Sequence, residues 1–497
     1  MSSTIERVLG SGRNWPLHGI AASRQIEQRG AAALAPHTLM RRAGEGVARL
    51  ALAIAPQAQR VWIACGPGNN GGDGLEAALH LQRLGRQVCV TLAAPAQSLP
   101  DDARDALARA QAAGVQPQAS LELPFAPELV IDGLLGLGAT RAPAGDIAQV
   151  IARLNRVEAP RLAIDLPSGL HADSGRLLGD VAVQAHHTLS LLTLKPGLFT
   201  AHGRDHAGAV WFDALGVDSG SGDALAWLID APRIADPRRH AQHKGSFGDV
   251  AVVGGAPGMT GAAWLAARAA HAAGAGRVYV SLLDADAPTL DLHRPELMAR
   301  PQWWTSSPPV LQASTVVCGC GGGSAVHAAL AVLLSRAGRL VLDADALNAI
   351  ADDPALLALL VQRSAPTVLT PHPLEAARLL GRSTADVQSD RLAAAHALAE
   401  RCRCVVLLKG SGSVIAAPGG APAINATGNA LLATAGTGDV LAGWIGGLWA
   451  QAPSMPAFDA ACAAAHRHGW AADRAAARGH KGPLRAADLV EAMLVDR

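Results

Sequence analysis

Three aspartates in the first half of the chain each follow a short apolar segment, and together they could hold a small polar molecule or a hard cation. Asp73 lies in the run GPGNNGGDG, Asp132 in VIDGLLGLG and Asp165 in AIDLPSG. Asn69 and Asn70 add amide oxygens, and carboxylate and amide oxygens suit alkali or alkaline-earth cations and ribose hydroxyls. One such aspartate more often caps a turn. Three of them beside a glycine-rich run indicate a small-molecule site.

The run GPGNNGGDG comes between a strand-like and a helix-like segment, which is where open parallel sheets bind ligands. Its glycines would let backbone N–H groups approach phosphates, and the start of a helix favours negative charge. The run matches neither the GxGxxG dinucleotide fingerprint nor the GK[ST] ending of a Walker loop. It predicts a ligand-binding loop of another kind.

The second half carries a different combination in TAGTGDVLAGWIGGLWA. Gly436, Thr437 and Gly438 lead into an apolar helix, so their N–H groups would face an anion. Asp439 falls in the first turn of that helix. It either complements the helix dipole or takes a proton from a hydroxyl that attacks a phosphate. This run alone leaves both interpretations open.

Further polar residues of the second half follow strand-like segments. They are Lys409 in LLKGSGSVI, His372 and Glu375 in TPHPLEAARLLG, and Asp343, Asp345 and Asn348 in LVLDADALN. Taken singly, Lys409 is compatible with a surface position and His372 with a helix N-cap. As a set with the glycine turn in GAPGMTGAA, they predict a nucleotide-dependent phosphoryl-transfer site.

Alternating strands and helices must position these residues. Strand-like segments in the first half are QRVWIACG, RQVCVTLAA, ELVIDGLLG, PRLAIDLPSG, HHTLSLLTLKPG and GAVWFDALG. In the second half they are GDVAVVGGA, GRVYVSLL, STVVCGCGGG, RLVLDADALN, PTVLTPHP and CVVLLKGSGSVIAA. Helical spacing in GLEAALHLQRLG and GAAWLAARAAHAAGA predicts parallel sheets with right-handed crossovers. The linker-like run GVDSGSGDA separates two α/β domains, predicted at residues 1–217 and 223–497.

Composition narrows the class of protein. The chain has 497 residues, which exceeds one ordinary core, and its 42 Lys and Arg nearly cancel its 41 Asp and Glu. This balance argues against nucleic acid or an anionic membrane as a partner. No signal peptide, membrane span or disulfide framework is recognisable, so we expect a cytoplasmic protein. Cys318 and Cys320 are interpreted as core residues of a strand.

Taken together, these strings resemble a known family. GPGNNGGDGLEAALHL, VIDGLLGLG, AIDLPSG and TLKPGL resemble the NAD(P)HX epimerase domain. GSFGDVAVVGGAPGMTGAA, HRPELM, DADALN, LTPHPLEAARLLG, LLKG and ATAGTGDVLAGWIGGL resemble the ADP-dependent NAD(P)HX dehydratase domain. The strings cover nearly the whole chain, in the order found in fused bacterial repair enzymes. The resemblance implies a Rossmann-like doubly wound first domain and a ribokinase-like α/β second domain.

The same resemblance implies a reaction. NADH or NADPH that has added water exists as R and S hydrates, collectively NAD(P)HX, which the first domain would interconvert. The second domain would dehydrate the S form at the expense of ADP, giving AMP and phosphate. The implied partners are NADHX, NADPHX and ADP, with K⁺ in the first domain and Mg²⁺ accompanying ADP in the second. The exposed ends of two open sheets and the Ala-rich helices predict a homo-oligomer.

In the first domain, the resemblance assigns substrate contacts to Asn69, Asn70, Gly71, Gly72, Asp73, Gly136, Leu137, Gly138, Ala139, Thr140, Arg141, Ala142 and Asp165. It assigns K⁺ to Asn70, Asp132 and Ser168. Asp165 is the candidate for proton transfer, because epimerising a carbinolamine carbon needs an acid–base group.

In the second domain, the implied substrate contacts are Ala262, Gly321, Gly323, His372 and Asp439, and the implied nucleotide contacts are Lys409, Gly410, Ser411, Gly412, Ser413 and Gly438. Asp439 would deprotonate the hydrate's hydroxyl, and the amides of Gly436–Gly438 would stabilise the transferring charge. The chain departs from the family pattern GPGLG, because Cys320 stands in place of the proline in Gly319–Gly323. GNALL also replaces the commoner GNPGM.

Two alternatives remain at this point. A ribokinase-like vitamin or thiazole kinase, fused to a nucleotide-binding module, would use the same GTGD turn and base. A nucleotide-sensing or protein-binding module fused to the dehydratase would leave the first domain without catalysis.

Overall fold

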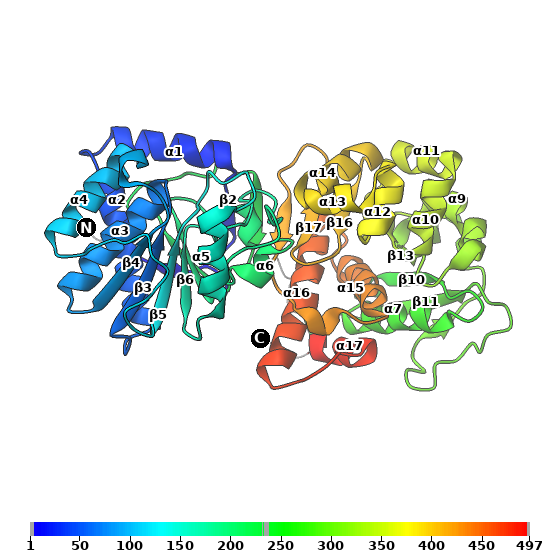
Figure 1. The fold of residues 1–497 in the computed structure, drawn as a ribbon. Helices are drawn as coiled ribbons and strands as arrows, with labels where there is room; N and C mark the ends of the chain where they lie inside the picture. Colours follow the sequence, from blue (N-terminus) through cyan, green and yellow to red (C-terminus); the bar gives the residue numbers. More distant parts are fainter. Residues whose placement is uncertain (1–3, 231, 233–237, 495–497) are drawn as a thin grey trace. The chain divides into compact units, whose positions relative to one another are not determined.

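The computed structural model describes residues 4–230, 232 and 238–494, and the chain divides into two compact units, Met1–Asp230 and Ala231–Arg497 (Figure 1). The linker-like run GVDSGSGDA is followed by one more short strand, β9 (Ala226–Ile229), which pairs antiparallel with β2 (Trp15–Leu17). The division between the units therefore falls after this strand, several residues beyond the predicted linker. The domain limits at residues 217 and 223 stay a prediction.

The first unit is built on a largely parallel sheet in the order β1-β8-β7-β6-β5-β3-β4, with β1 antiparallel to β8. The chain adds β4 on one side of β3 and then β5 on the other, so the strand order reverses between β3 and β5. Open sheets bind ligands at such a reversal. The strands are β1 (Glu6–Arg7), β3 (Arg60–Cys65), β4 (Gln87–Leu92), β5 (Leu129–Gly133), β6 (Arg161–Ile164), β7 (His187–Leu191) and β8 (Ala209–Asp213).

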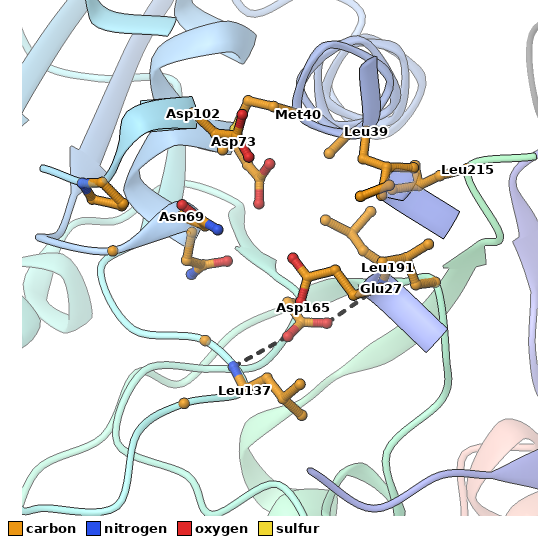
Figure 2. Close-up of a pocket in the computed structure, with 18 of the residues that line it drawn as sticks. Glu27, Leu39, Met40, Asn69, Asp73, Asp102, Leu137, Asp165, Leu191 and Leu215 are labelled. Atoms are coloured by element: carbon orange, nitrogen blue, oxygen red, sulfur yellow. Dashed lines mark hydrogen bonds between the residues drawn. The ribbon is translucent and has the colours of Figure 1, made fainter. Parts of the chain in front are cut away.

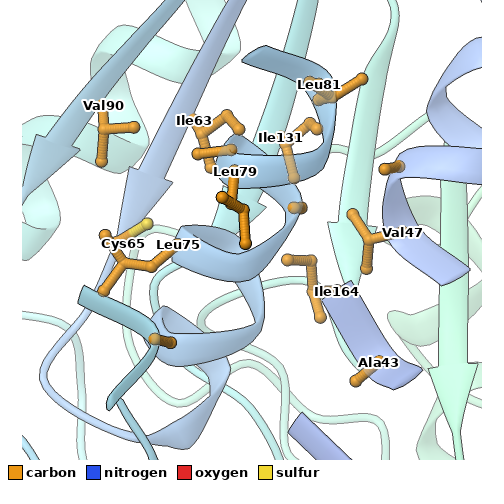
Figure 3. Packing of buried hydrophobic residues seen from close by; sticks show 14 of the residues in the cluster. Ala43, Val47, Ile63, Cys65, Leu75, Leu79, Leu81, Val90, Ile131 and Ile164 are labelled. Carbon is orange, nitrogen blue, oxygen red and sulfur yellow. The ribbon is translucent and has the colours of Figure 1, made fainter. Parts of the chain in front are cut away.

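Side chains of successive strand residues point to opposite faces of this sheet and enter two separate cores. Ile63 and Ile131 pack with α2 and α3 (Figure 3), whereas Trp62 and Val130 pack with α5 on the other face. Because both faces are covered, the central strands β3, β5 and β6 consist mainly of apolar residues. The helices are α1 (Ile20–Ala32), α2 (Thr38–Ile54), α3 (Asn69–Arg83), α4 (Asp101–Ala112), α5 (Gly145–Arg156) and α6 (Gly203–His206).

The second unit has strands in the order β12-β11-β10-β13-β14-β15-β16-β17-β18. Those from β12 to β16 are parallel, and β16, β17 and β18 are successively antiparallel. The segment CVVLLKGSGSVIAA is thus two strands joined by a turn. The strands are β10 (Asp249–Gly254), β11 (Arg277–Leu282), β12 (Met298–Ala299), β13 (Thr315–Cys318), β14 (Arg339–Leu342), β15 (Thr367–Leu369), β16 (Val405–Leu408), β17 (Ser413–Ala416) and β18 (Ala423–Asn425).

Helices α7 and α15 cross closely and pack on the sheet of the second unit, with α16 beside α15 (Figure 1). Small residues permit this approach, because a methyl group on Gly443 would overlap the carbonyl oxygen of Ala266. The helices are α7 (Thr260–Ala272), α8 (Pro308–Ala313), α9 (His327–Arg336), α10 (Asp345–Asp352), α11 (Pro354–Gln362), α12 (Pro373–Leu380), α13 (Thr384–Ser389), α14 (Arg391–Cys402), α15 (Thr437–Gln451), α16 (Ala457–Ala477) and α17 (Ala486–Leu494).

Among the described helices, none combines the length and the apolar character that crossing a membrane would require.

The crossing of α7 and α15 gives a test of packing. We expect Gly443→Ala to lower the free energy of unfolding of the second unit by about 2 kcal/mol, because the two helices must separate. Gly261→Ala on α7 is the matched control, since its added methyl meets nothing within 4 Å. It should be neutral or stabilising by up to about 1 kcal/mol. Denaturation in guanidinium chloride measures both, and equal effects would contradict the packing described.

Candidate active sites

The first unit contains a cavity of about 670 Å³ at the carboxyl ends of β3, β5 and β6, beside the reversal in strand order (Figure 2). Eight predicted substrate residues line it: Asn69, Asn70, Asp73, Gly136, Leu137, Gly138, Ala139 and Asp165. The exposed residues Thr140, Arg141 and Ala142 do not line it. The structure therefore brings most of the predicted substrate residues of the first unit to one cavity.

The glycine-rich run is not an extended loop, because α3 begins at Asn69 and includes most of it. Its glycines are required by backbone packing. A Cβ on Gly66 would overlap the carbonyl oxygen of Leu134, and one on Gly71 would overlap that of Gly66. Gly71 and Gly72 are buried and do not line the cavity, since Gly71 packs against Gly66, and Gly72 against Met40 and Ala103. Within this run, the predicted residues that line the cavity are Asn69, Asn70 and Asp73.

Asp165 has a constrained position at the edge of the cavity. Its backbone adopts the left-handed region at φ 66°, which is costly for a residue with a side chain. Its carboxylate accepts hydrogen bonds from the N–H groups of Leu137 at 3.3 Å and Leu191 at 3.4 Å, and it forms an ion pair with Lys195. Lys195 is 2% exposed and also donates to the carbonyl of Leu191 at 2.8 Å. These contacts hold the carboxylate in place at the cavity wall.

The residues predicted to hold K⁺ are partly assembled. Ser168 donates its hydroxyl to Asp132 Oδ1 at 2.6 Å and its backbone N–H to Oδ2 at 2.8 Å. Burial raises the pKa of Asp132 to about 6, although hydrogen bonds from Ser168 and Leu134 oppose this. Asn70 lies beside Gly136, and its buried amide nitrogen has no hydrogen-bond partner. The carboxylate, hydroxyl and amide oxygens fit a hard cation chemically, whereas the Asn70 amide nitrogen is a hydrogen-bond donor and would not be a ligand.

Two further carboxyl groups make the cavity acidic. Burial, followed by the charges of Asp165 and Glu27, raises the pKa of Asp73 well above its usual value. Burial, followed by the charge of Asp165, raises the pKa of Glu27. Glu27 and Lys195 were not assigned roles from the sequence. The helical spacing of Ser23, Glu27 and Ala31 could have indicated that one face of α1 lines a site.

The second site lies where β14, β15 and β16 end, at one edge of their sheet. Lys409, which follows β16, forms an ion pair of 2.7 Å with Asp343, which follows β14 and is 1% exposed. Thr370 donates its hydroxyl to the same carboxylate oxygen at 2.8 Å. Burial lowers the pKa of Lys409, but the carboxylates of Asp343 and Glu375 raise this pKa overall. The lysine is therefore a cation that faces the site.

Asp439 lies in the first turn of α15, close to this ion pair. A carboxylate oxygen of Asp439 lies within 4.8 Å of a carboxylate oxygen of Asp343 and of Cys320 Sγ, and these last two atoms are also within 4.8 Å of each other. Burial, followed by the charge of Asp343, raises the pKa of Asp439 to about 7. A Cβ on the neighbouring Gly438 would lie 3.3 Å from Lys409 Nζ. Asp439 and the glycine turn of one segment therefore lie close to Lys409 of another segment.

The loop that departs from the family pattern lies against α7. Gly321 has φ 57°, and a Cβ there would lie 3.0 Å from the Cβ of Ala262. Gly323 donates its N–H to Asp345 Oδ2 at 2.8 Å. The structure thus brings the predicted substrate residues Ala262, Gly321 and Gly323 together. Cys320 is fully buried, as predicted for a core residue, but it also faces the two aspartates.

His372 acts as the N-cap of α12. Its Nδ1 accepts hydrogen bonds from the N–H groups of Leu374 at 3.1 Å and Glu375 at 3.4 Å. The carboxylate of Glu375 in turn accepts a hydrogen bond from the N–H of His372. Burial, followed by the charge of Lys409, lowers the pKa of His372. The cap interpretation describes its structural role, and its half-exposed ring also places Nε2 3.1 Å from Glu375 Oε1. The predicted nucleotide residues Lys409–Ser413 form the turn between β16 and β17.

Known families match both units of the chain. Residues 36–197 match the family described as YjeF-related protein N-terminus, and residues 250–493 match NAD(P)H-hydrate dehydratase. The bifunctional NAD(P)H-hydrate repair enzyme Nnr of Escherichia coli K12 is 39% identical over 465 residues, covering 91% of this chain and 88% of that protein. The corresponding enzyme of Coxiella burnetii is 38% identical over 468 residues, covering 92% and 94%.

Among solved structures, the ADP/ATP-dependent NAD(P)H-hydrate dehydratase of Bacillus subtilis, co-crystallised with ATP and Mg²⁺, is 28% identical. It aligns with a TM-score of 0.44 over 52% of this chain and 92% of its own.

The folds and sites define a two-domain α/β enzyme, with a Rossmann-like first unit and a ribokinase-like second unit, as predicted. The chain belongs to the family of bifunctional NAD(P)H-hydrate repair enzymes. The alternative of a vitamin or thiazole kinase is not favoured, because the similarity to these enzymes extends through both units.

The buried ion pair of the first unit gives a stability prediction. We expect Lys195→Met to lower the free energy of unfolding of that unit by about 3 kcal/mol, because Asp165 would remain buried without its cation. Arg29→Met is the control, since Arg29 and Asp223 form an exposed pair of 3.6 Å, and its effect should be below about 1 kcal/mol. Urea denaturation measures both. A Lys195→Met protein as stable as the control would show that the pair is not needed.

Proposed function

We propose that the chain restores hydrated NADH and NADPH, with the first unit interconverting the R and S hydrates and the second dehydrating the S hydrate with ADP. The observation that carries this proposal is the convergence of Asp439, Lys409 and Asp343 at one sheet edge in a chain similar to bifunctional repair enzymes over about nine-tenths of its length. The cavity of about 670 Å³ in the first unit supports the epimerase activity.

In the second unit, Asp439 takes the proton of the hydrate's hydroxyl. The oxygen then attacks the terminal phosphorus of ADP, and AMP leaves. Phosphate departs from the resulting ester together with a ring proton, which restores the double bond of the dihydronicotinamide. The N–H groups of Gly436–Gly438 and the Lys409 ammonium stabilise charge on the transferring phosphoryl group.

Mg²⁺ accompanies ADP in this proposal. Oδ1 of Asp343 accepts hydrogen bonds from Lys409 and Thr370, and its Oδ2 faces Gly438 at the N-terminus of α15. A carboxylate oxygen in that place fits a hard cation. When bound, Mg²⁺ neutralises phosphate charge. Ala262, Gly321, Gly323 and His372 are the proposed substrate contacts, and Lys409, Gly410, Ser411, Gly412, Ser413 and Gly438 the proposed nucleotide contacts.

In the first unit, Asp165 is the proposed acid–base group, because its carboxyl group lies on the wall of the cavity and is held there by Lys195. The dinucleotide's phosphates fit the start of α3 beside Asn69, because the N-terminus of a helix favours an anion. K⁺ would be held by Asn70, Asp132 and Ser168, and it would supply positive charge near those phosphates. Association of the chain into a homo-oligomer remains part of the proposal.

The test starts from a mixture of R and S hydrates of NADH, with ADP, with ATP or with neither. We expect full return of dihydronicotinamide absorbance with ADP and K⁺. Asp165→Asn should stop recovery near the S fraction, after correction for spontaneous epimerisation, and Asp439→Asn should abolish recovery altogether. Full recovery by Asp165→Asn would contradict its catalytic role and favour a binding module. If the native protein restored no dihydronicotinamide absorbance with either nucleotide, the proposed function would be contradicted.

The pH dependence of dehydration follows from Asp439. Because a general base acts in its ionised form, and burial raises the pKa of Asp439 to about 7, the rate should rise with pH and reach half its plateau near pH 7. Below that value kcat/KM for the S hydrate with ADP should fall about tenfold per pH unit. Initial rates between pH 5 and 9 measure this. A profile flat across pH 7 would exclude Asp439 as the base.

A further inference from the structure

Glu27 lies in the cavity of the first unit and has no role in the chemistry described above. It is on α1, four residues from Ser23 and from Ala31, so the three share the helix face that lines the cavity. Ser23 anchors this face, because its hydroxyl hydrogen-bonds with Thr193 Oγ1 at 2.8 Å. Figure 2 shows the Glu27 side chain extending toward Asp165. The cavity therefore presents two carboxyl groups from different elements.

The two carboxyl groups differ in their surroundings. Lys195 pairs directly with Asp165 and stabilises its ionised form. Glu27 has no ion pair among the described residues, and burial and then the charge of Asp165 raise its pKa. The charged groups that face it are Arg24 on α1, Asp73 on α3, Asp102 on α4, and Asp165 and Lys195 after β6 and β7. Such a pair of unequal carboxyl groups suits one proton donor and one acceptor.

We propose that Glu27 is the proton donor that works with Asp165 in inverting the hydrate's carbinolamine carbon, an inference that rests on the epimerase activity proposed above. Glu27 gives its proton to the hydroxyl, the C–O bond breaks, and water leaves. The lone pair of the ring nitrogen forms a C=N bond, giving a planar iminium cation. The carboxyl-rich cavity favours this cation.

Inversion is completed when water adds to the opposite face of the iminium carbon. A new C–O bond forms, the C=N electron pair returns to nitrogen, and Asp165 accepts the proton released by the water. Asp165 then holds the proton that Glu27 gave up, and exchange through solvent restores the starting state. The net result is inversion of the carbinolamine carbon, with its hydroxyl oxygen exchanged for one from solvent.

Asp73 is less suited to be the donor, because it lies on α3 close to Asn69, at the end of the cavity where the phosphates are proposed to bind. The ring carbon would then lie toward Asp165 and Glu27.

The test uses the full chain, the R hydrate of NADH, K⁺ and no nucleotide, with R and S forms separated by chromatography. Glu27→Gln should lower kcat for epimerisation by about 100-fold with little change in KM. The native enzyme should lose rate at alkaline pH as Glu27 ionises, and the variant should lack that limb. Glu45→Gln, the same substitution at an exposed position of α2, should behave as the native enzyme.

Three further readouts make the result decisive. Glu27→Asp, which keeps a carboxyl group, should recover part of the rate lost in Glu27→Gln, and an unchanged melting temperature would show that both variants fold. In water enriched in ¹⁸O, each inversion should introduce one solvent oxygen. A Glu27→Gln rate within twofold of native, or inversion without ¹⁸O uptake, would overturn the inference. A native enzyme no faster than spontaneous epimerisation would overturn the epimerase function and this inference with it.

Discussion

In each unit one buried lysine–aspartate ion pair is the interaction on which the site depends. Parallel strands end at a common edge, so the aspartates that follow them arrive there close together and largely out of water. Lys195 compensates Asp165 in the first unit, and Lys409 compensates Asp343 in the second. Without these lysines, the burial of several carboxylates at one edge would be too costly to maintain.

The ion pairs also divide the carboxyl groups into two kinds. A paired carboxylate is stabilised in its ionised form, whereas an unpaired neighbour has its pKa raised by burial and by the charge beside it, as Asp439 and Glu27 do. Groups of different proton affinity thus lie side by side, which is what acid–base chemistry at neutral pH requires. In the mechanisms proposed above, this difference in proton affinity serves phosphoryl transfer in one unit and inversion of a carbon in the other.

Close backbone packing is the second requirement of both sites. Gly66 and Gly71 allow the start of α3 to approach the loop after β5, and Gly321 allows the loop after β13 to approach α7. The close approach that these glycines allow brings backbone N–H groups and polar side chains to the proposed sites. Their abundance in the sequence predicted a site, and the structure shows that these glycines serve backbone packing.

The sequence by itself determined the strand–helix alternation, the two-unit organisation and most of the residues that gather at the sheet edges, because period and turn chemistry are local properties. Strand order, the short strands β2 and β9, the start of α3 at Asn69 and the hairpin of β16 and β17 were decided by tertiary pairing. Lys195 and Glu27 acquired their roles only when β7 and α1 were brought beside Asp165. Charge compensation and proton affinity depend on neighbours distant in the chain, and the fold alone supplies those neighbours.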